Sequence, residues 1–303
     1  MQKIDYKASD GLDINVVLWK GDFTPKAIIQ ISHGMAEHIK RYSQFANFLV
    51  SKGYYVYGHD HRGHGETAAS VSKLGYFADK FGWRLVVDDL HDINCMIKKR
   101  HPDVEVIIFG HSMGSFIART FMYKYPGQVK RFIISGTGDG ENFSVIGAKM
   151  LAKSICRIKG KKYKSKILDF ISNRKFNKEI YDAKGEFEWL STDHYEVKKY
   201  RDDPYCGTLF TCGFYYDLFK GIEHLSMEPN IKKVDKDVDL FIISGEQDPV
   251  GDKGNGIVKV VRSYKRNGIN NVKYKLYRNM RHEILNEMDR QMVYNDIIDY
   301  LEN

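Results

Sequence analysis

The apolar positions of this chain form short runs that alternate with longer stretches of helical spacing. The runs that predict strands lie at residues 26–31, 54–57, 104–109, 131–134, 238–244 and 272–277. Between them, stretches such as 83–99 repeat apolar residues every three or four positions, which is typical of amphipathic helices. Strands that alternate with helices at this spacing indicate the α/β class, with a mostly parallel sheet and helices on both faces.

The first and last parts of the chain add elements to this core. Residues 2–7 and 12–19, separated by Ser9-Asp10-Gly11, predict an antiparallel hairpin. Residues 252–267 predict a helix, and residues 283–301 predict one long closing helix.

The alternation breaks after residue 136 and resumes near residue 238. The intervening segment is rich in Lys, Tyr and Phe, and its helical stretches lie at 143–158, 164–172, 186–200 and 208–220. One core with a helical insertion explains this pattern better than two consecutive domains. We therefore expect core segments at 1–136 and 231–303 and an inserted helical cap at 137–230.

A G-x-S-x-G sequence, Gly110-His111-Ser112-Met113-Gly114, directly follows one predicted strand and precedes a predicted helix. This context favours a strained turn that exposes a nucleophile over a serine that only caps a helix. The two glycines let the strand and the helix pass closely, and the turn lifts the serine clear of the sheet. Ser112 is therefore the candidate nucleophile.

A serine hydroxyl becomes a nucleophile when a base takes its proton and a carboxylate orients that base. In sheets of this kind, the acid follows a later strand and the histidine follows the last one. Asp248 and His282 lie directly after the last two predicted strands, at the edge where α/β sheets bind ligands. Glu246 is a competing acid, but Pro249 stiffens the loop that aims Asp248. The predicted triad is Ser112, Asp248 and His282.

Three histidines that are close in sequence, His59, His61 and His64, raise the alternative of a metal site. No carboxylate or cysteine completes a familiar ligand spacing around them, so we expect no metal there. The run Arg62-Gly63-His64-Gly65 is expected to brace the floor of the site instead.

The distribution of charge suggests a partner. The net charge of the chain is +8, and residues 145–166 alone contain eight basic residues and no acid. This segment is interpreted either as a solvated helix face or as a surface that is attracted to anionic lipid. No motif supports binding to nucleic acid.

Cysteine spacing and the length of apolar runs bear on location. The four cysteines are too far apart for a C-x-x-C pattern and suggest no disulfide framework, which favours a reducing compartment. The first residues lack an apolar core of signal-peptide length, and no apolar run reaches about 18 residues. We expect a cytoplasmic protein that at most contacts a membrane peripherally.

The serine motif occurs in the chain together with four others. These are His33-Gly34-Met35-Ala36-Glu37-His38, Asp60-His61-Arg62-Gly63-His64-Gly65, Gly245-Glu246-Gln247-Asp248-Pro249-Val250 and Arg281-His282-Glu283. As a set, they resemble α/β-hydrolases of the monoacylglycerol lipase and lysophospholipase type. The resemblance covers the core from about residue 25 onward, is loose in the insertion and departs at Glu66-Thr67, where the family usually has a small polar residue.

The resemblance implies an α/β-hydrolase fold with an inserted helical cap, and a reaction that uses no cofactor and no metal. It also implies that the backbone N–H groups of Met35 and Met113 form the oxyanion hole, since a tetrahedral intermediate needs two fixed donors for its new negative charge. In the cap, Phe210 and Phe214 are expected either to line the path of an acyl chain or to pack in the core.

The expected activity is hydrolysis of monoacylglycerols, lysophospholipids or similar carboxylic esters through an acyl-enzyme. The same triad suits a peptidase or a thioesterase. The scaffold also suits a receptor that binds a small ligand with little turnover.

Overall fold

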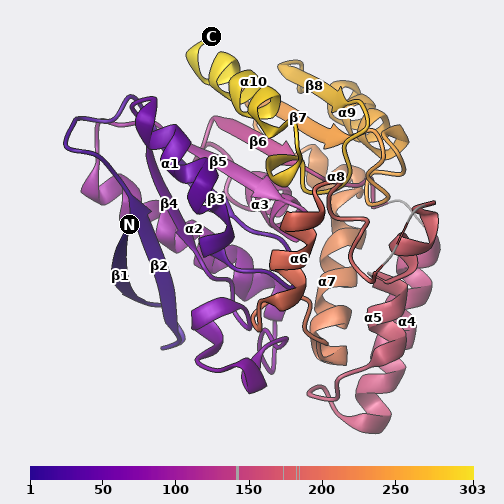
Figure 1. Ribbon diagram of the computed structural model, residues 1–303. Coiled ribbons are helices and arrows are strands. Elements are labelled where there is room, and N and C mark those ends of the chain that lie inside the picture. Colours follow the sequence, from indigo (N-terminus) through magenta and orange to yellow (C-terminus); the bar gives the residue numbers. More distant parts are fainter. Residues whose placement is uncertain (141–142, 173, 182, 184) are drawn as a thin grey trace.

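The computed structural model describes residues 1–140, 143–172, 174–181, 183 and 185–303. Within these residues one eight-stranded sheet runs in the order β1-β2-β4-β3-β5-β6-β7-β8 (Figure 1). The strands are β1 (Gln2–Lys7), β2 (Asp13–Trp19), β3 (Ile28–Ser32), β4 (Tyr55–His59), β5 (Val106–His111), β6 (Arg131–Ser135), β7 (Asp239–Gly245) and β8 (Val272–Tyr277). Strand β2 pairs antiparallel with β1 and β4, and the pairs from β4 to β8 are parallel. The predicted α/β class and the N-terminal hairpin are confirmed.

The helices fall into two groups by their place in the chain. Those that connect or follow strands of the sheet are α1 (Ser43–Ser51), α2 (Gly82–Arg100), α3 (Met113–Lys124), α9 (Asn255–Arg266) and α10 (Arg290–Glu302). Those between β6 and β7 are α4 (Phe143–Lys159), α5 (Lys166–Ser172), α6 (His194–Asp202), α7 (Cys212–Leu225) and α8 (Glu228–Ile231). Figure 1 shows α4, α5, α6 and α7 gathered on one side of the sheet, and α7 packs against α2, α3 and α4.

The side-chain alternation of the central strands builds a core on each face of the sheet. Ile107 and Phe109 of β5 belong to the cluster that α1 and α10 cover. Ile108, between them, belongs to the cluster that α2, α3, α7 and α9 cover. A strand must be apolar at every position to fill both clusters, which is why its sequence shows no polar alternation.

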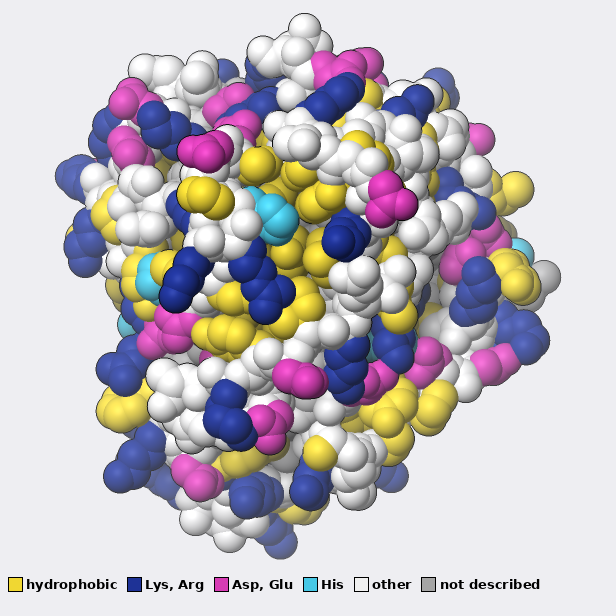
Figure 2. All heavy atoms as spheres, turned by 90° about the vertical axis from the view of Figure 1, so that its left-hand side faces the viewer, with side chains coloured by type: hydrophobic (Ala, Val, Ile, Leu, Met, Phe, Trp, Pro, Cys, Tyr) yellow, Lys and Arg dark blue, Asp and Glu magenta, His cyan; other side chains and the backbone are white. Residues whose placement is uncertain are grey.

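Charged side chains of both signs are intermixed around the edge strand β1. Figure 2 shows the side of the molecule that lies to the left in Figure 1, where basic and acidic side chains intermix around a central group of hydrophobic ones. Glu66 illustrates the pattern, because its carboxylate pairs with both Lys3 and Lys40. By count, the basic excess of the chain equals that of residues 145–166, which hold eight basic residues and no acid.

Two of the predicted helices begin well before the observed ones, and the helix expected at 208–220 lies at Cys212–Leu225. The helix expected at 186–200 begins only at His194, where the Asp193 carboxylate caps it by accepting from Tyr195 N–H. The closing helix expected at 283–301 is interrupted, and α10 begins at Arg290. The interruption contains Glu287, a buried carboxylate that accepts from backbone N–H groups outside the helix. Hydrogen bonds to distant backbone thus compete with local helix formation.

In the described residues, no helix combines the length and the hydropathy that crossing a bilayer requires.

Candidate active site

Ser112 joins β5 to α3 in a strained conformation. Its φ is 53° and its ψ is −120°, outside the regions that a side-chain-bearing residue ordinarily occupies. The turn is held because Ser112 N–H donates to the Ser135 carbonyl at 2.9 Å. Gly114, the second residue of α3, has the tightest surroundings of the glycines in the described residues, since a Cβ there would lie 1.9 Å from the Ser32 carbonyl oxygen. The strand–turn–helix context predicted for the serine motif is confirmed.

We expect Gly114→Ala to destabilise the fold by about 1–3 kcal/mol, because the added methyl group meets the backbone of β3 rather than a movable side chain. Gly147→Ala is the matched control. Gly147 is an exposed glycine in α4 with open space around its Cβ position, and alanine there is expected to add roughly 0.5–1 kcal/mol. Urea unfolding midpoints of the two variants measure both effects. A midpoint of Gly114→Ala equal to that of the wild type contradicts the packing argument.

Asp248 and His282 form a buried hydrogen-bonded pair. His282 Nδ1 lies 2.9 Å from Asp248 Oδ1. The carboxylate also accepts from Val250 N–H at 2.9 Å and from the Ser244 hydroxyl at 3.0 Å. Glu246, the competing acid, is exposed. Of the two carboxylates, Asp248 is thus the one that contacts the histidine.

Electrostatic interactions within the pair keep the Asp248 carboxylate ionised and make the His282 imidazole more basic. Burial by itself raises the pKa of Asp248, but His282 and the hydrogen bonds to the carboxylate outweigh it, and the net pKa is lowered. Burial lowers the pKa of His282, yet the adjacent Asp248 carboxylate outweighs it and the net pKa is raised. A carboxylate that stays ionised and an imidazole of increased basicity are what a general base and its partner require.

The loop after β8 crosses the ends of two strands to bring His282 toward β5. It passes directly over Gly245 at the end of β7, where a Cβ would lie 2.2 Å from the Met280 carbonyl oxygen. It then reaches the end of β6, where a Cβ on Gly136 would lie 3.0 Å from His282 Cε1. The His282 ring finally rests 4.7 Å, centroid to centroid, from that of His111, the residue before the predicted nucleophile.

A cavity of about 480 Å³ lies at this edge of the sheet and is lined by Ser112 together with Met35 and Met113. The apolar side chains that contribute to its wall are Phe116, Val145, Ala148, Ile171, Phe176, Trp189, Leu218, Phe219, Ile222 and Val250. Most of them come from the segment between β6 and β7. The wall suits an apolar substrate group of substantial length.

Phe210 and Phe214, expected as candidates for that wall, are not among the lining residues. Both are fully buried, and their rings lie 4.9 Å and 5.8 Å from the ring of His64. The structure therefore places them in core packing, the other alternative. Leu218 and Phe219, further along α7, lie at the cavity. Helical spacing alone could not separate the residues that pack in the core from those that line the cavity, because both faces of α7 are apolar.

The loop after β3 brings Met35 close to the serine. A Cβ on Gly34 would lie 2.6 Å from Glu37 Oε1 and 3.2 Å from Ser112 Cβ, so a side chain at this position would crowd the approach. Met113 is the first residue of α3, and backbone N–H groups in a first helical turn have no partner within the helix. Both predicted oxyanion donors thus belong to segments that meet at Ser112.

Arg41, whose side chain is 9% exposed and which the motifs did not reveal, links that loop to the histidine segment. Arg41 contacts Glu37 at 2.8 Å and Glu283 at 2.6 Å, and Glu37 accepts from Gly34 N–H. Burial raises the pKa of Glu283, but the Arg41 guanidinium outweighs it and lowers that pKa to about 2. The only feature of the sequence that pointed to this ion pair was the position of Glu283 directly after His282.

The clustered histidines lie beneath the site as neutral, packed rings. Burial lowers the pKa of His59 to about 3 and that of His64 to about 4. His33 Nε2 accepts from His61 N–H at 2.9 Å, and the His33 and His61 rings are 4.3 Å apart. These contacts connect the loops that follow β3 and β4. That Arg62-Gly63-His64-Gly65 braces the floor of the site stays a prediction.

Comparison with known proteins defines the family. The model of the family described as serine aminopeptidase, S33, matches residues 24–289. Human monoglyceride lipase is 31% identical over 157 residues, which is 47% of each chain. The monoacylglycerol lipase of Mycolicibacterium smegmatis is 31% identical over 126 residues, 42% of this chain and 43% of that one. The chain thus spans about half the length of the curated relatives it matches.

Solved structures match over nearly the whole chain. A carboxyl esterase from Bacillus coagulans in complex with glycerol superposes with a TM-score of 0.92 at 26% identity, covering 99% of this chain and 97% of that one. A soluble variant of monoglyceride lipase from Saccharomyces cerevisiae, in complex with a substrate analog, has a TM-score of 0.77 at 18% identity and covers 99% and 93%. The second likeness concerns the fold alone.

Proposed function

The chain belongs to the α/β-hydrolase family described as serine aminopeptidase, S33, and on this premise we propose that it is a serine hydrolase of carboxylic esters. The observation that carries the proposal is the combination of a strained Ser112 at an apolar cavity with a buried Asp248–His282 pair beside the residue that precedes it. Strained backbone conformations and side chains with shifted pKa values cluster at catalytic and binding sites, so their occurrence beside an apolar cavity supports a catalytic role.

In the proposed reaction, Ser112 Oγ attacks the ester carbonyl carbon while His282 Nε2 accepts the hydroxyl proton. Asp248 holds the proton on His282 Nδ1 and so leaves Nε2 free to act as the base. His282 then gives its proton to the leaving alcohol, and an acyl-enzyme forms. Water attacks this ester and loses a proton to His282. That proton passes to Ser112 Oγ as the acyl–oxygen bond breaks, which regenerates the hydroxyl and releases the free acid.

The backbone N–H groups of Met35 and Met113 are the proposed oxyanion donors. The negative oxygen of each tetrahedral intermediate would lie at the N-terminus of α3, where the helix dipole also favours negative charge. Donors fixed by the backbone need no reorganisation as the charge develops, and one such donor is worth roughly 3–4 kcal/mol. Arg41, Glu37 and Glu283 tie the loop that carries Met35 to the segment that carries His282.

The proposed substrates are monoacylglycerols, lysophospholipids or similar esters with an acyl chain. The apolar part of the cavity wall supports this, and residues 137–230 are proposed to act as the cap that supplies it. A peptidase that recognises a free amino terminus would need an unpaired acid to bind the ammonium group. Of the two cavity acids, Asp139 is paired with Lys259 at 3.1 Å and Asp252 is exposed to solvent. The mostly apolar wall favours an ester with an apolar chain over a peptide.

A series of p-nitrophenyl esters of increasing chain length tests substrate class. We expect kcat/KM to rise by up to about 4-fold per methylene until the cavity is filled, since each buried CH2 is worth about 0.8 kcal/mol. Aminoacyl p-nitroanilides and acyl thioesters are the comparison substrates. Faster turnover of either would favour the peptidase or thioesterase alternative, and binding of esters without any turnover would favour the receptor.

We also propose that the basic segment 145–166 contacts an anionic lipid surface. The large exposed apolar side chains of α4 and α5 are Ile146, Met150, Leu151, Ile158, Ile167 and Phe170. They occur among Lys153, Arg157, Lys159 and Lys166, all of them exposed. Apolar side chains beside cations are the combination that binds a helix to an anionic membrane interface.

Co-sedimentation with vesicles is expected to show binding to phosphatidylglycerol that weakens as salt rises, because screening reduces the attraction. Combining Lys153→Glu with Arg157→Glu should weaken it by about 10-fold or more, since each cation near such a surface contributes about 1 kcal/mol. Lys20→Glu, an exposed lysine outside the segment, is the control. Binding that is insensitive to salt, or no binding at all, would contradict the proposal.

A further inference from the structure

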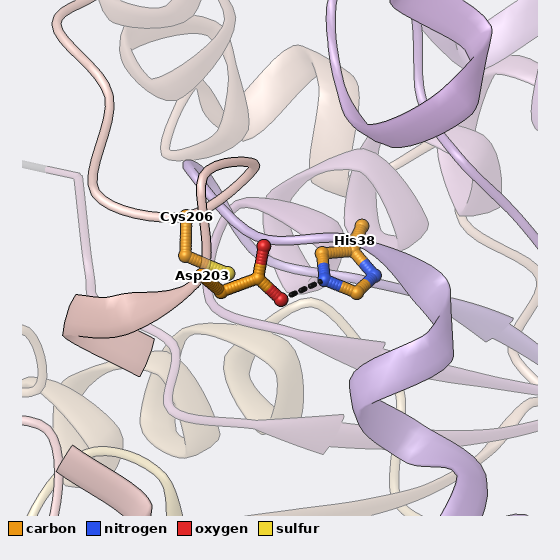
Figure 3. A group of neighbouring side chains, drawn as sticks. All are labelled: His38, Asp203 and Cys206. Carbon is orange, nitrogen blue, oxygen red and sulfur yellow. Dashed lines mark hydrogen bonds and ion pairs between the residues drawn. The ribbon is translucent and has the colours of Figure 1, made fainter. Parts of the chain in front are cut away.

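Three potential metal ligands from distant parts of the chain converge where the turn after α6 meets the loop after β3. They are His38, Asp203 and Cys206, and Figure 3 shows the three side chains gathered between these segments. Their ligand atoms all lie within 4.8 Å of one another, and His38 Nε2 is 2.9 Å from Asp203 Oδ2. In the part of the chain that the structure describes, this is the one group of three such residues at ligand spacing.

A tight turn presets two of the three ligands. Asp203 directly follows α6, and Cys206 N–H donates to the Asp203 carbonyl at 3.0 Å. Tyr205 N–H donates to Asp203 Oδ1 at 2.8 Å, which leaves Oδ2 directed at His38. Two ligands three residues apart across a turn match the spacing of C-x-x-C zinc knuckles, here with a carboxylate in the first position. A backbone donor that fixes a ligating carboxylate is a typical outer-shell contact.

The third ligand is held against this turn by the backbone. Gly207 N–H, next to Cys206, donates to the Ala36 carbonyl at 3.0 Å, and Ala36 lies two residues before His38. Tetrahedral zinc with bonds of about 2.0–2.3 Å needs ligand atoms about 3.3–3.8 Å apart. Adjustments on the order of 1 Å would therefore suffice. The hydrogen bond between Gly207 and Ala36 already holds the turn against the loop, so the ion does not have to bring these segments together.

We propose that His38, Asp203 and Cys206 bind a divalent cation of the zinc class, with water as the fourth ligand. The thiol gives its proton to solvent as the sulfur–metal bond forms, so that one thiolate and one carboxylate balance the two positive charges. Cys206 is buried, whereas the Asp203 side chain is 30% exposed. The exposed carboxylate marks the side from which an ion and its water enter.

The positive charge of Arg41 does not oppose this assignment. Arg41 interacts electrostatically with Cys206, and its guanidinium lies over the Tyr200 ring at 4.8 Å. Its charge is matched by Glu37 and Glu283, which both contact it. The inference is independent of the proposed ester chemistry, because none of its three residues belongs to the predicted triad.

A bound ion would fasten the turn after α6 to the loop that carries Met35. A ligand that binds only the folded state stabilises it by mass action. We therefore expect Zn²⁺ to raise the thermal midpoint of the full chain after treatment with a chelator, and the rise to grow with Zn²⁺ concentration.

Co²⁺ titration of the same chelator-treated protein identifies the ligands. One equivalent should produce a sulfur-to-cobalt charge-transfer band and the strong visible bands of tetrahedral Co²⁺, and Zn²⁺ should displace them. Cys206→Ser should abolish the charge-transfer band. Cys95→Ser, which alters an exposed cysteine elsewhere, should leave it unchanged.

Asp203→Asn tests the site even if Cys206→Ser does not fold. Asparagine keeps the turn, because its side-chain oxygen still accepts from Tyr205 N–H, but it removes the charged ligand. We expect Zn²⁺ affinity to fall by on the order of 100-fold, since outer-shell partners alone are worth about 10–100-fold. Absence of the charge-transfer band in the wild type overturns the proposal. So does a band that survives Cys206→Ser or Asp203→Asn but disappears in Cys156→Ser, because Cys156 and Cys212 are two thiols that lie 3.1 Å apart and could bind Co²⁺ instead.

Discussion

Replacing Ser112 with alanine is expected to lower kcat for p-nitrophenyl esters by about 10⁴-fold or more, with little change in KM. The hydroxyl is the proposed nucleophile, and its loss leaves only the oxyanion donors and substrate binding to assist attack by water. The fold should persist, because alanine at residue 112 keeps the backbone hydrogen bond to Ser135. Steady-state kinetics together with labelling by a fluorophosphonate probe measure the effect.

Ser115→Ala is the matched control for this experiment. Ser115 lies three residues further along α3, and its hydroxyl donates to the Ser112 carbonyl at 2.6 Å rather than to any group of the predicted triad. This variant should retain labelling and most of the activity. Labelling that persists in Ser112→Ala would mean that another residue is the nucleophile.

Replacing Asp248 with asparagine is expected to lower kcat/KM by about 10⁴-fold while the fold remains intact. The amide is nearly isosteric with the carboxylate, but its NH2 group can donate to His282 Nδ1 and so favours the tautomer with a proton on Nε2. An imidazole in that form cannot accept the serine proton. Glu246→Gln, which removes the exposed carboxylate of the same loop, should leave kcat/KM unchanged.

The pH profile gives the same prediction a second readout. The base must be neutral, so kcat/KM falls as pH drops through the pKa of His282, which Asp248 holds above its usual value of 6.5. In Asp248→Asn the raising carboxylate is gone, while burial, which lowers the pKa, persists. The acid limb should therefore move to lower pH in the variant. A limb at the same pH in both proteins would show that Asp248 does not act through His282.

Sequence was most informative where a local stretch determines both backbone and chemistry. The apolar run before Ser112, the glycines beside it and the helical spacing after it predict a strand, a turn and a helix, and these are confirmed as β5 and α3. The order of strands also predicted that Asp248 and His282 follow β7 and β8. Their pairing, at 2.9 Å, depends on a loop that crosses Gly245 and Gly136.

What could not be predicted depends on contacts between distant segments. Arg41 has an ordinary helical neighbourhood in the sequence, and only the fold places it between Glu37 and Glu283. Phe210 and Phe219 lie on the same insertion and have the same character, yet one packs on His64 and the other lines the cavity. Periodicity reports that a side chain is buried and carries no information about what it is buried against.

The position of His282, in the loop after the last strand, also means that it is synthesised well after Ser112. The elbow at Ser112 belongs to β5, whereas His282 arrives only with β8, the strand at the far edge of the sheet. A ribosome that adds about 5–20 residues per second makes the serine on the order of ten seconds before the histidine. A nascent chain would thus hold the proposed nucleophile without its proposed base, and the proposed hydrolytic activity would arise only once the last strand has docked.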